Sequence, residues 1–223
     1  IKKFCTKLYI YNELKDLRIS KNNKNINKIN NINFHEKQNL YEEKLWFKKK
    51  KYKLCDIAKT LSFDSLSSKN AIQQINKFDY DVGFVYGTSK LSKEFINSFK
   101  APLYNFHGGD PELYRGLDSH LWSIYHKDKN GLILTMHLID QILDNGDIIF
   151  KTNLPILRDT ELFQLRSITT NECINLSRIT LNCIKNSLNL PSISQNRIGR
   201  YYSSIPTELI RKCELNFQKM FKC

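Results

Sequence analysis

An Asn, a His and a later Asp are the residues of this chain whose types and spacing suggest chemistry. Asn105 and His107 stand two positions apart, directly before Gly108 and Gly109, and Asp144 follows further along the chain. Alternate side chains of a strand share a face, so the first two are expected to point the same way. An amide can donate to a developing oxyanion, and a His can carry a proton near neutral pH. An Asp beside the His can orient the imidazole and stabilise its charged form.

Each of these features also has an ordinary structural explanation. A His at a strand end often serves only as a hydrogen-bonding group, and the segment Asp144-Asn145-Gly146-Asp147 has a common turn composition. From spacing alone, the structural explanation is the more frequent one. The catalytic trio is therefore a hypothesis at this point.

Strand and helix patterns alternate around these residues. Apolar runs between turn signals predict buried strands, and Ser residues before apolar-periodic segments predict helix starts. Such an order is typical of an α/β fold with a mostly parallel sheet and helices on both faces, in which ligands bind at the carboxyl ends of strands. Asn105 and His107 fall at such an end. The expected strands are 82–87, 103–107, 132–139 and 148–154, and the expected helices are 67–77, 92–99, 117–127, 160–187 and 206–221.

Composition indicates one globular domain, or one domain with a small appendage. The chain has 223 residues, of which 41% are hydrophobic. No apolar run reaches the roughly 20 residues that cross a bilayer, and no secretory signal is visible. We therefore expect no membrane association and a cytoplasmic location. The six Cys form no CxxC pair and fit no zinc spacing, so no metal site is expected.

The positive charge is concentrated at the front of the chain. The net charge is +13, and residues 1–53 hold fifteen Lys or Arg against five Asp or Glu. Charge runs are usually solvated surfaces, so nucleic acid is not the expected partner. Residues 4–10 could form a strand, and residues 20–35 read as a flexible Asn-rich loop. Residues 40–53 suggest a short helix that ends in a Lys run, and residues 52–57 a strand or entry segment.

Four motifs in this sequence resemble, in order and spacing, the formyltransferases that use 10-formyltetrahydrofolate. That family includes enzymes acting on methionyl-tRNA, on glycinamide ribonucleotide and on amino sugars. Gly-Gly-Asp-Pro, the segment 116–122 and, more weakly, 199–203 look most like the sugar N-formyltransferase branch. The motifs are Asn105-Phe106-His107-Gly108-Gly109-Asp110-Pro111, Tyr114-Arg115-Gly116, Thr135-Met136-His137 and Leu143-Asp144-Asn145-Gly146-Asp147-Ile148-Ile149.

The resemblance implies a Rossmann-like catalytic domain over residues 1–190, with a short C-terminal extension over 191–223. By it, Asn105 would hold and polarise the formyl oxygen, His107 would help to move a proton from the attacking amine, and Asp144 would fix and charge-balance His107. The formyl donor would be 10-formyltetrahydrofolate and the acceptor a nucleotide-linked amino sugar.

The resemblance also implies where the two substrates bind. The folate would lie between the segments 84–91 and 139–144, and Gly108, Gly109 and Arg115 would meet the acceptor. His137 could support the trio or be an ordinary core His, and the second is favoured. A homodimer is left open. The predicted folate-binding residues are Phe84, Tyr86, Gly87, Leu91, Ile139 and Leu143.

The front end departs from the family pattern. Members usually open with an apolar strand and a Gly-containing turn, but here no Gly precedes Gly83. The C-terminal part is too short for the barrel domain with which the tRNA enzymes hold tRNA. Two alternatives stay open: formyl transfer to another amine such as methionyl-tRNA, and an inactive family member with a basic nucleic-acid-binding front end.

Overall fold

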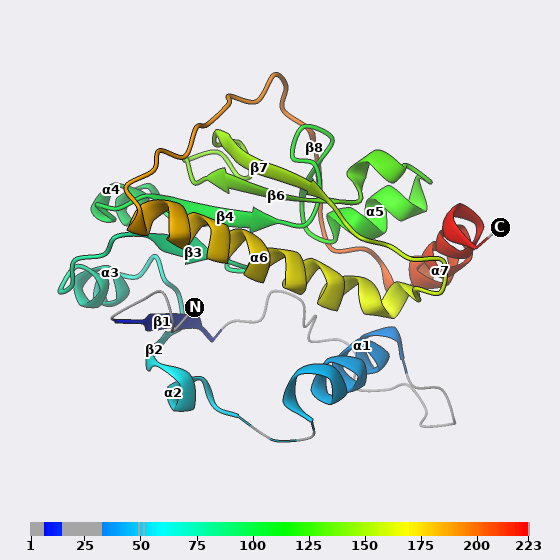
Figure 1. Ribbon diagram of the computed structural model, residues 1–223, viewed down its shortest axis with the longest axis horizontal. Coiled ribbons are helices and arrows are strands. Elements are labelled where there is room, and N and C mark those ends of the chain that lie inside the picture. Colours follow the sequence, from blue (N-terminus) through cyan, green and yellow to red (C-terminus); the bar gives the residue numbers. More distant parts are fainter. Residues whose placement is uncertain (1–6, 15–32, 49, 51, 223) are drawn as a thin grey trace.

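A four-stranded sheet forms the centre of the molecule. The computed structural model describes residues 7–14, 33–48, 50 and 52–222. Two of the strands, β3 and β4, run parallel, and β6 and β7 are each antiparallel to the strand before them in the sheet. All four were predicted from the sequence. In sheet order they are β3 (Gly83–Val85), β4 (Leu103–His107), β6 (Ile133–Leu138) and β7 (Ile148–Asn153) (Figure 1).

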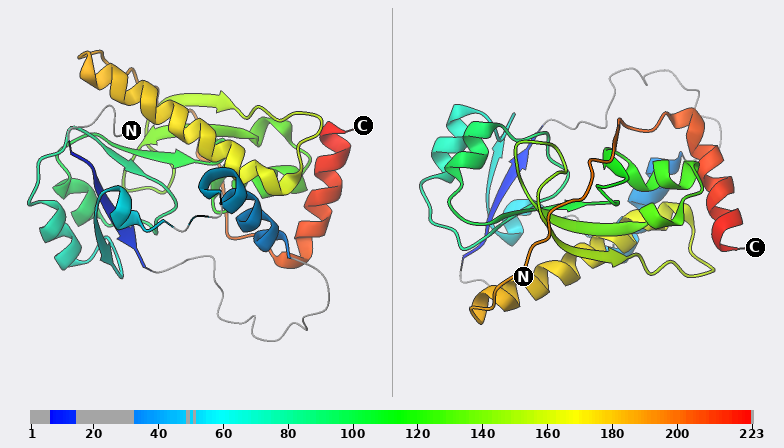
Figure 2. Two further views of the ribbon diagram at one scale, coloured as in Figure 1. Left: turned by 60° about the horizontal axis from the view of Figure 1, so that its bottom comes forward. Right: turned by 90° about the horizontal axis from the view of Figure 1, so that it is seen from above.

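Helices cover both faces of this sheet. Tyr104 and Phe106 of β4 point into the larger core, which α6 closes from one side. Leu103, on the opposite face, belongs to a second core made with α3 and α4. Figure 2 shows α6 running along the sheet, away from these two helices. The predicted Rossmann-like α/β class is confirmed. The helices are α3 (Lys69–Ile75), α4 (Lys93–Ser98) and α6 (Leu165–Lys185), the last preceded by the 3-10 turn η3 (Leu162–Gln164).

Ser side chains start the two short helices as predicted. Ser68 Oγ accepts a hydrogen bond from the Ala71 N–H at 3.2 Å, and Ser92 Oγ accepts one from the Phe95 N–H at 3.2 Å. Each bond satisfies a backbone donor that has no partner within the first helical turn. The helices therefore begin at fixed positions beside the sheet.

A second parallel pair extends the fold at its N-terminal side. Strand β1 (Tyr9–Glu13) pairs with β2 (Lys59–Phe63). The predicted strand at 4–10 overlaps β1 only at its end, and residues 4–6 lie outside the described part. The segment 52–57, predicted as a strand or entry, instead contains the short helix α2 (Leu54–Ile57). Strand β2 follows this helix.

The predicted flexible loop at 20–35 ends in a helix start. Residues 20–32 lie outside the described part, but Asn33 Oδ1 accepts a hydrogen bond from the Glu36 N–H at 2.8 Å and caps a helix. That helix, α1, lies against η3 and the beginning of α6, as the left view of Figure 2 shows. The predicted helix near 40–53 thus begins earlier. Its parts are α1 (Phe34–Glu42) and the π-helical turn η1 (Glu43–Phe47).

The C-terminal residues fold back onto the body of the protein. Strands β5 and β8 pair in parallel, and Asn216 of α7 donates hydrogen bonds to the carbonyls of Ile124 and Tyr125. The boundary at residue 190 stays a prediction. The elements are β5 (Tyr114–Gly116), α5 (Ser119–Tyr125), the turn η2 (Lys129–Gly131), β8 (Arg200–Tyr202) and α7 (Thr207–Phe221).

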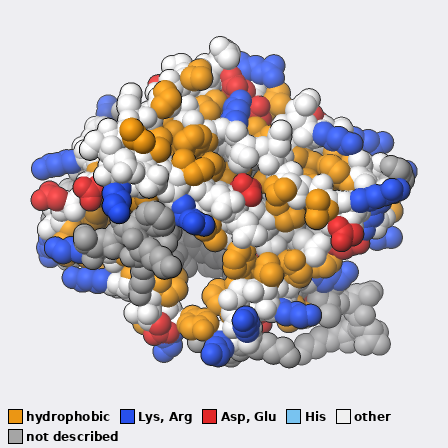
Figure 3. Space-filling view, in the orientation of Figure 1, with side chains coloured by type: hydrophobic (Ala, Val, Ile, Leu, Met, Phe, Trp, Pro, Cys, Tyr) orange, Lys and Arg blue, Asp and Glu red, His pale blue; other side chains and the backbone are white. Residues whose placement is uncertain are grey.

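Charged groups are spread over the surface. Figure 3 shows Lys and Arg side chains at many places on one face, with hydrophobic side chains between them, so the positive charge forms no single continuous field there. Within the described segments, no helix is both long and apolar enough to cross a membrane.

Candidate active site

Strand β4 directs Asn105 and His107 to one side of the sheet. Phe106 between them is buried in the core on the other side, stacked on Phe84 with ring centroids 5.7 Å apart. This is the alternation expected of a strand. The apolar neighbour thus anchors the strand, while the two polar side chains face the loop that follows β6.

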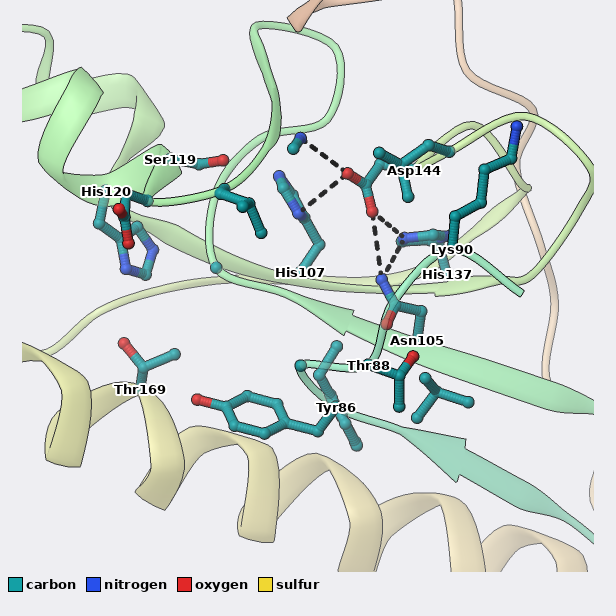
Figure 4. Close-up of a pocket in the computed structure, with 18 of the residues that line it drawn as sticks. Tyr86, Thr88, Lys90, Asn105, His107, Ser119, His120, His137, Asp144 and Thr169 are labelled. Carbon is teal, nitrogen blue, oxygen red and sulfur yellow. Dashed lines mark hydrogen bonds and ion pairs between the residues drawn. The ribbon is translucent and has the colours of Figure 1, made fainter. Parts of the chain in front are cut away.

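Asp144 reaches both residues from that loop. Its Oδ1 lies 3.3 Å from Nδ2 of Asn105, and its Oδ2 lies 3.6 Å from Nδ1 of His107 (Figure 4). The backbone N–H of Gly116 donates to Oδ2 at 2.9 Å. Gly116 has a φ of +93°, and a Cβ there would lie 2.2 Å from the Tyr202 carbonyl oxygen. The structure therefore brings the three predicted residues together, and a glycine allows the backbone to approach the carboxylate.

His107 has a defined tautomer in this arrangement. Its Nε2 lies 2.7 Å from the carbonyl oxygen of Tyr114, which can only accept, so the proton sits on Nε2. His107 is 5% exposed. Burial lowers the pKa of His107 below its ordinary value, although the charge of Asp144 and the Tyr114 carbonyl act in the opposite direction. The ring is therefore neutral near pH 7, with Nδ1 free to accept a proton beside the carboxylate.

Asp144 stays ionised despite being only 7% exposed. Burial raises its pKa, but the neighbouring rings of His137 and His107, which are positively charged whenever they are protonated, and the Gly116 N–H outweigh burial and hold the pKa below its ordinary value. A charged carboxylate next to a neutral imidazole can stabilise the imidazolium that forms when the ring takes a proton.

The amide of Asn105 is oriented by two acceptors. Its Nδ2 lies 3.1 Å from Nε2 of His137 and 3.3 Å from Asp144. His137 donates from Nδ1 to the Leu138 carbonyl at 2.7 Å, which leaves Nε2 as an acceptor. His137 is thus a buried residue with both nitrogens bonded, and it supports Asn105. To donate to a formyl oxygen, Asn105 must give up one of its two Nδ2–H bonds, either the one to His137 or the one to Asp144.

A cavity of about 470 Å³ opens beside the trio. This is within the usual size of small-molecule sites. Five of the six predicted folate-binding residues line it. The exception is Phe84, whose ring packs against Tyr104 and Phe106. The five are Tyr86, Gly87, Leu91, Ile139 and Leu143.

The loop after β3 is held in place by the first strand. Glu13, the last residue of β1, accepts hydrogen bonds from the Ser89 N–H at 2.8 Å, from Ser89 Oγ at 2.6 Å and from the Leu66 N–H at 3.2 Å. Burial raises the pKa of Glu13, but these donors outweigh it and lower the pKa. This link was not predicted, because it joins residues far apart in the chain.

One of the three predicted acceptor-side residues lines the cavity and two do not. Gly108 lines it, whereas Gly109 and Arg115 are outside its lining. Arg115 Nε is buried without a hydrogen-bond partner among the described residues, and so is the hydroxyl of Ser119, a cavity residue that is 3% exposed. Tyr201, from the strand that pairs with β5, also lines the cavity.

Helices α1 and α6 close the cavity with residues that were not predicted. His35 and Gln38 come from α1, and Arg166 and Thr169 come from α6. Arg166 joins the two helices, since Nε and Nη2 lie 2.7 Å and 2.8 Å from the two carboxylate oxygens of Glu42. Asn33, three residues before a Glu, was the available signal for α1.

Comparison with known families agrees with this geometry. The model of the formyl transferase family matches residues 19–177. The chain belongs to this family. The matched range includes the predicted trio Asn105, His107 and Asp144, whose individual roles stay predictions.

Solved formyltransferases share the fold at low sequence identity. PseJ from Anoxybacillus kamchatkensis, in complex with UDP-4,6-dideoxy-4-formamido-L-AltNAc and tetrahydrofolate, is 21% identical, with 70% of this chain and 79% of that chain covered and a TM-score of 0.55. An N-formyltransferase from Helicobacter canadensis, in complex with folinic acid and dTDP-3-aminofucose, is 17% identical, with 88% and 70% covered and a TM-score of 0.54. A 4-N formyltransferase from Francisella tularensis is 23% identical at a TM-score of 0.53, and the match covers 77% of this chain but 63% of that one. The chain thus spans less than two thirds of the length of some formyltransferases that it matches.

Proposed function

We propose that this protein transfers a formyl group from 10-formyltetrahydrofolate to the amine of a nucleotide-linked amino sugar. The observation that carries the proposal is the contact of Asp144 with both Asn105 and His107 at the wall of a cavity of about 470 Å³. An ionised carboxylate, a neutral imidazole and an amide at one place are the groups that acyl transfer to an amine requires.

The cavity has features that suit a folate. Gly87 and Leu143 border it, and Tyr86, Leu91 and Ile139 give it aromatic and aliphatic walls. The buried hydroxyl of Ser119 has no protein partner in the described chain and faces this space. Buried polar groups are rarely left unpaired, so a bound molecule is a suitable partner for it.

The reaction exchanges one carbon–nitrogen bond for another. The formyl carbon bonds to the acceptor nitrogen as its bond to the folate nitrogen breaks. In the same exchange the acceptor nitrogen loses one proton and the folate nitrogen gains one. Asn105 donates an Nδ2–H to the formyl oxygen as negative charge grows there. The Nδ1 atom of His107 takes the proton from the acceptor amine, and Asp144 stabilises the resulting imidazolium.

The acceptor class has support from both sequence and relatives. The Gly-Gly-Asp-Pro segment that follows His107 resembles the sugar branch, and two similar structures are complexes with nucleotide-linked sugars. Arg115 is outside the cavity lining, and its guanidinium stays the predicted partner of the nucleotide phosphates because of its charge and planar donors.

A reducing compartment such as the cytoplasm is the expected location. Four cysteines in the described part are free: Cys55, Cys173, Cys183 and Cys213.

Product analysis tests the proposal. Purified protein is incubated with 10-formyltetrahydrofolate and a panel of UDP- and dTDP-linked amino sugars, with methionyl-tRNA as an alternative acceptor. Mass spectrometry should find a formylated sugar nucleotide and an equal amount of tetrahydrofolate, and Asp144→Asn should abolish both. Formylation of methionyl-tRNA alone would overturn the acceptor class, and no formyl transfer to any acceptor by folded protein would overturn the enzyme itself.

A further inference from the structure

The segment between α6 and β8 passes beside the loop that carries Asp144. We call residues 192–199 the strap. Figure 1 shows this part of the chain passing from the end of α6 over the sheet toward β8. Its hydrogen bonds go to two loops, the one that carries Asp144 and the one that follows β4. These are the loops on which the catalytic trio depends.

The strap holds the Asp144 loop through its backbone. Gln195 Nε2 donates to the carbonyl oxygens of Asp144 at 3.0 Å and of Gly146 at 2.9 Å. Beside it, Ile193 and Ile148 exchange two backbone hydrogen bonds of 2.9 Å and 2.8 Å. The hydroxyls of Ser192 and Ser194 donate to the Asp147 carboxylate of the same loop at 3.3 Å and 2.9 Å. Of the strap side chains, Gln195 is the one that bonds to the backbone of Asp144 itself.

The backbone of this loop needs such support. Asp144 has a φ of +52°, a left-handed conformation that costs a residue with a Cβ about 1 kcal/mol or more. At Gly146 a Cβ would lie 1.8 Å from the Leu138 carbonyl oxygen, so the loop packs tightly on β6. A strained conformation persists only where its surroundings hold it.

Gln195 makes these bonds at a cost. Both of its partners are carbonyl oxygens, so the amide nitrogen must face them, and Oε1 is left buried without a partner among the described residues. An unpaired buried acceptor costs about 1–3 kcal/mol. An apolar side chain of the same shape would avoid that cost, so the two bonds to the loop are the distinguishing property of the glutamine.

The strap also supports the loop that fixes His107. The Asn196 N–H donates to Glu112 Oε1 at 2.8 Å, and Glu112 lies in the loop that leads to Tyr114. The carbonyl oxygen of Tyr114 receives the Nε2–H of His107. The strap thus supports both the loop that carries Asp144 and the loop that leads to Tyr114, the partner of His107.

We propose that Gln195 is a positioning residue for formyl transfer, which keeps the Asp144 carboxylate within reach of His107 by holding the Asp144 and Gly146 carbonyls. The proposal rests on the proposed function of the trio. It assigns a catalytic contribution to the segment after residue 190, which the sequence suggested was an extension of the catalytic domain.

Gln195→Met tests this role. Methionine keeps the length of the side chain and removes the unpaired oxygen together with both donated bonds, so the variant should fold with a Tm lowered by only a few degrees. The kcat should fall about 10- to 100-fold while the KM for the donor changes little, because a small misplacement of a catalytic group has effects of this size. Gln218→Met on the exposed surface of α7 is the matched control and should be unchanged.

An NMR titration of His107 tests the geometry without turnover. The charge of Asp144 raises the pKa of His107, so a displaced carboxylate should move this pKa downward in Gln195→Met but not in Gln218→Met. Gln195→Asn, which withdraws the amide by one methylene group, is a milder variant and should move the pKa of His107 in the same direction. An unchanged pKa and kcat in the Gln195 variants would overturn the positioning role. An inactive parent protein whose His107 pKa still shifts in Gln195→Met would overturn the proposed function and leave the positioning intact.

Discussion

The Nδ1 atom of His107 lies 3.6 Å from Oδ2 of Asp144, and both side chains are buried. Because the Nε2–H of the same ring is bonded to the Tyr114 carbonyl, Nδ1 is the position at which this imidazole can accept a proton. The negative charge of the buried carboxylate favours a proton at this position, while burial of the ring keeps the pKa of His107 below its ordinary value. In the proposed reaction, Asp144 would act on the substrates through His107.

Asp144→Asn should abolish most turnover. The substitution keeps the shape of the side chain but removes the charge that stabilises the imidazolium, so kcat should fall about 100- to 10,000-fold. Binding of tetrahydrofolate, measured by calorimetry, should survive. Asp159→Asn, on an exposed turn, is the control. Full turnover in Asp144→Asn would contradict the assignment of the carboxylate.

Buried histidines should make stability fall in mild acid. Burial lowers the pKa of His120 to about 4 from an ordinary 6.5, and the pKa of His107 is lowered as well. A His with a depressed folded-state pKa binds protons more readily when unfolded, so the stability is full above pH 6.5 and declines as the pH falls from there toward the folded-state pKa. Urea unfolding at several pH values should show this decline, and His120→Asn should reduce its slope. An equal slope in that variant would argue against a neutral, buried His120.

Glu13→Gln should loosen the donor side of the cavity. One of its carboxylate oxygens would become an NH₂ group facing the donors of Ser89, so bonds to a charged acceptor are lost. We expect a loss of about 1–2 kcal/mol in the free energy of unfolding and a several-fold rise in the KM for the folate. Steady-state kinetics measure this effect. Glu43→Gln on the exposed turn η1 should change neither value, and an unchanged KM in Glu13→Gln would show that the loop holds its shape without the strand.

Helix α1 should depend more on one aromatic ring than on its ion pair. Phe34 is 8% exposed and belongs to the larger core, so Phe34→Ala should cost about 3 kcal/mol and weaken donor binding, since α1 carries cavity residues. The pair of Arg166 with Glu42 is partly exposed, and Arg166→Met should cost about 1 kcal/mol or less. Thermal unfolding and folate titration of both variants give the comparison. A larger effect of Arg166→Met would reverse the ranking.

The parts of the fold with strong local patterns could be predicted from the sequence. Strand β4 was expected from its apolar run and following glycines. Ser67 or Ser68 was expected to cap one helix and Ser92 to open the next, and the caps are Ser68 and Ser92. Asn105 and His107 followed from the period of a strand. Asp144 was a candidate from its residue type and its turn, and the family motif linked it to the other two, because no local pattern tells which distant loop will meet a strand end.

The unpredicted parts of the site depend on contacts between distant segments. Glu13 and Gln195 act through loops 76 and 51 residues away, and neither lies in a motif. The start of helix α1 was missed for another reason, because the Asn-rich composition up to Asn33 is typical of a flexible loop, whereas Asn33 itself caps the helix. Long-range partners and a start signal inside a biased segment are both poorly visible to local pattern reasoning.

The spacing of these contacts along the chain has a consequence for folding. Strand β8 pairs with β5, Trp122 donates to the Ser203 carbonyl 81 residues away, and Glu13 reaches Ser89 across 76 residues. Contacts that close long loops form late, since the entropy of closing each loop is lost before the contact can stabilise the chain. The helices and the β6–β7 hairpin can form early, whereas the pocket acquires its final shape only when both distant ends have arrived. Catalytic competence should therefore appear after most of the secondary structure during refolding.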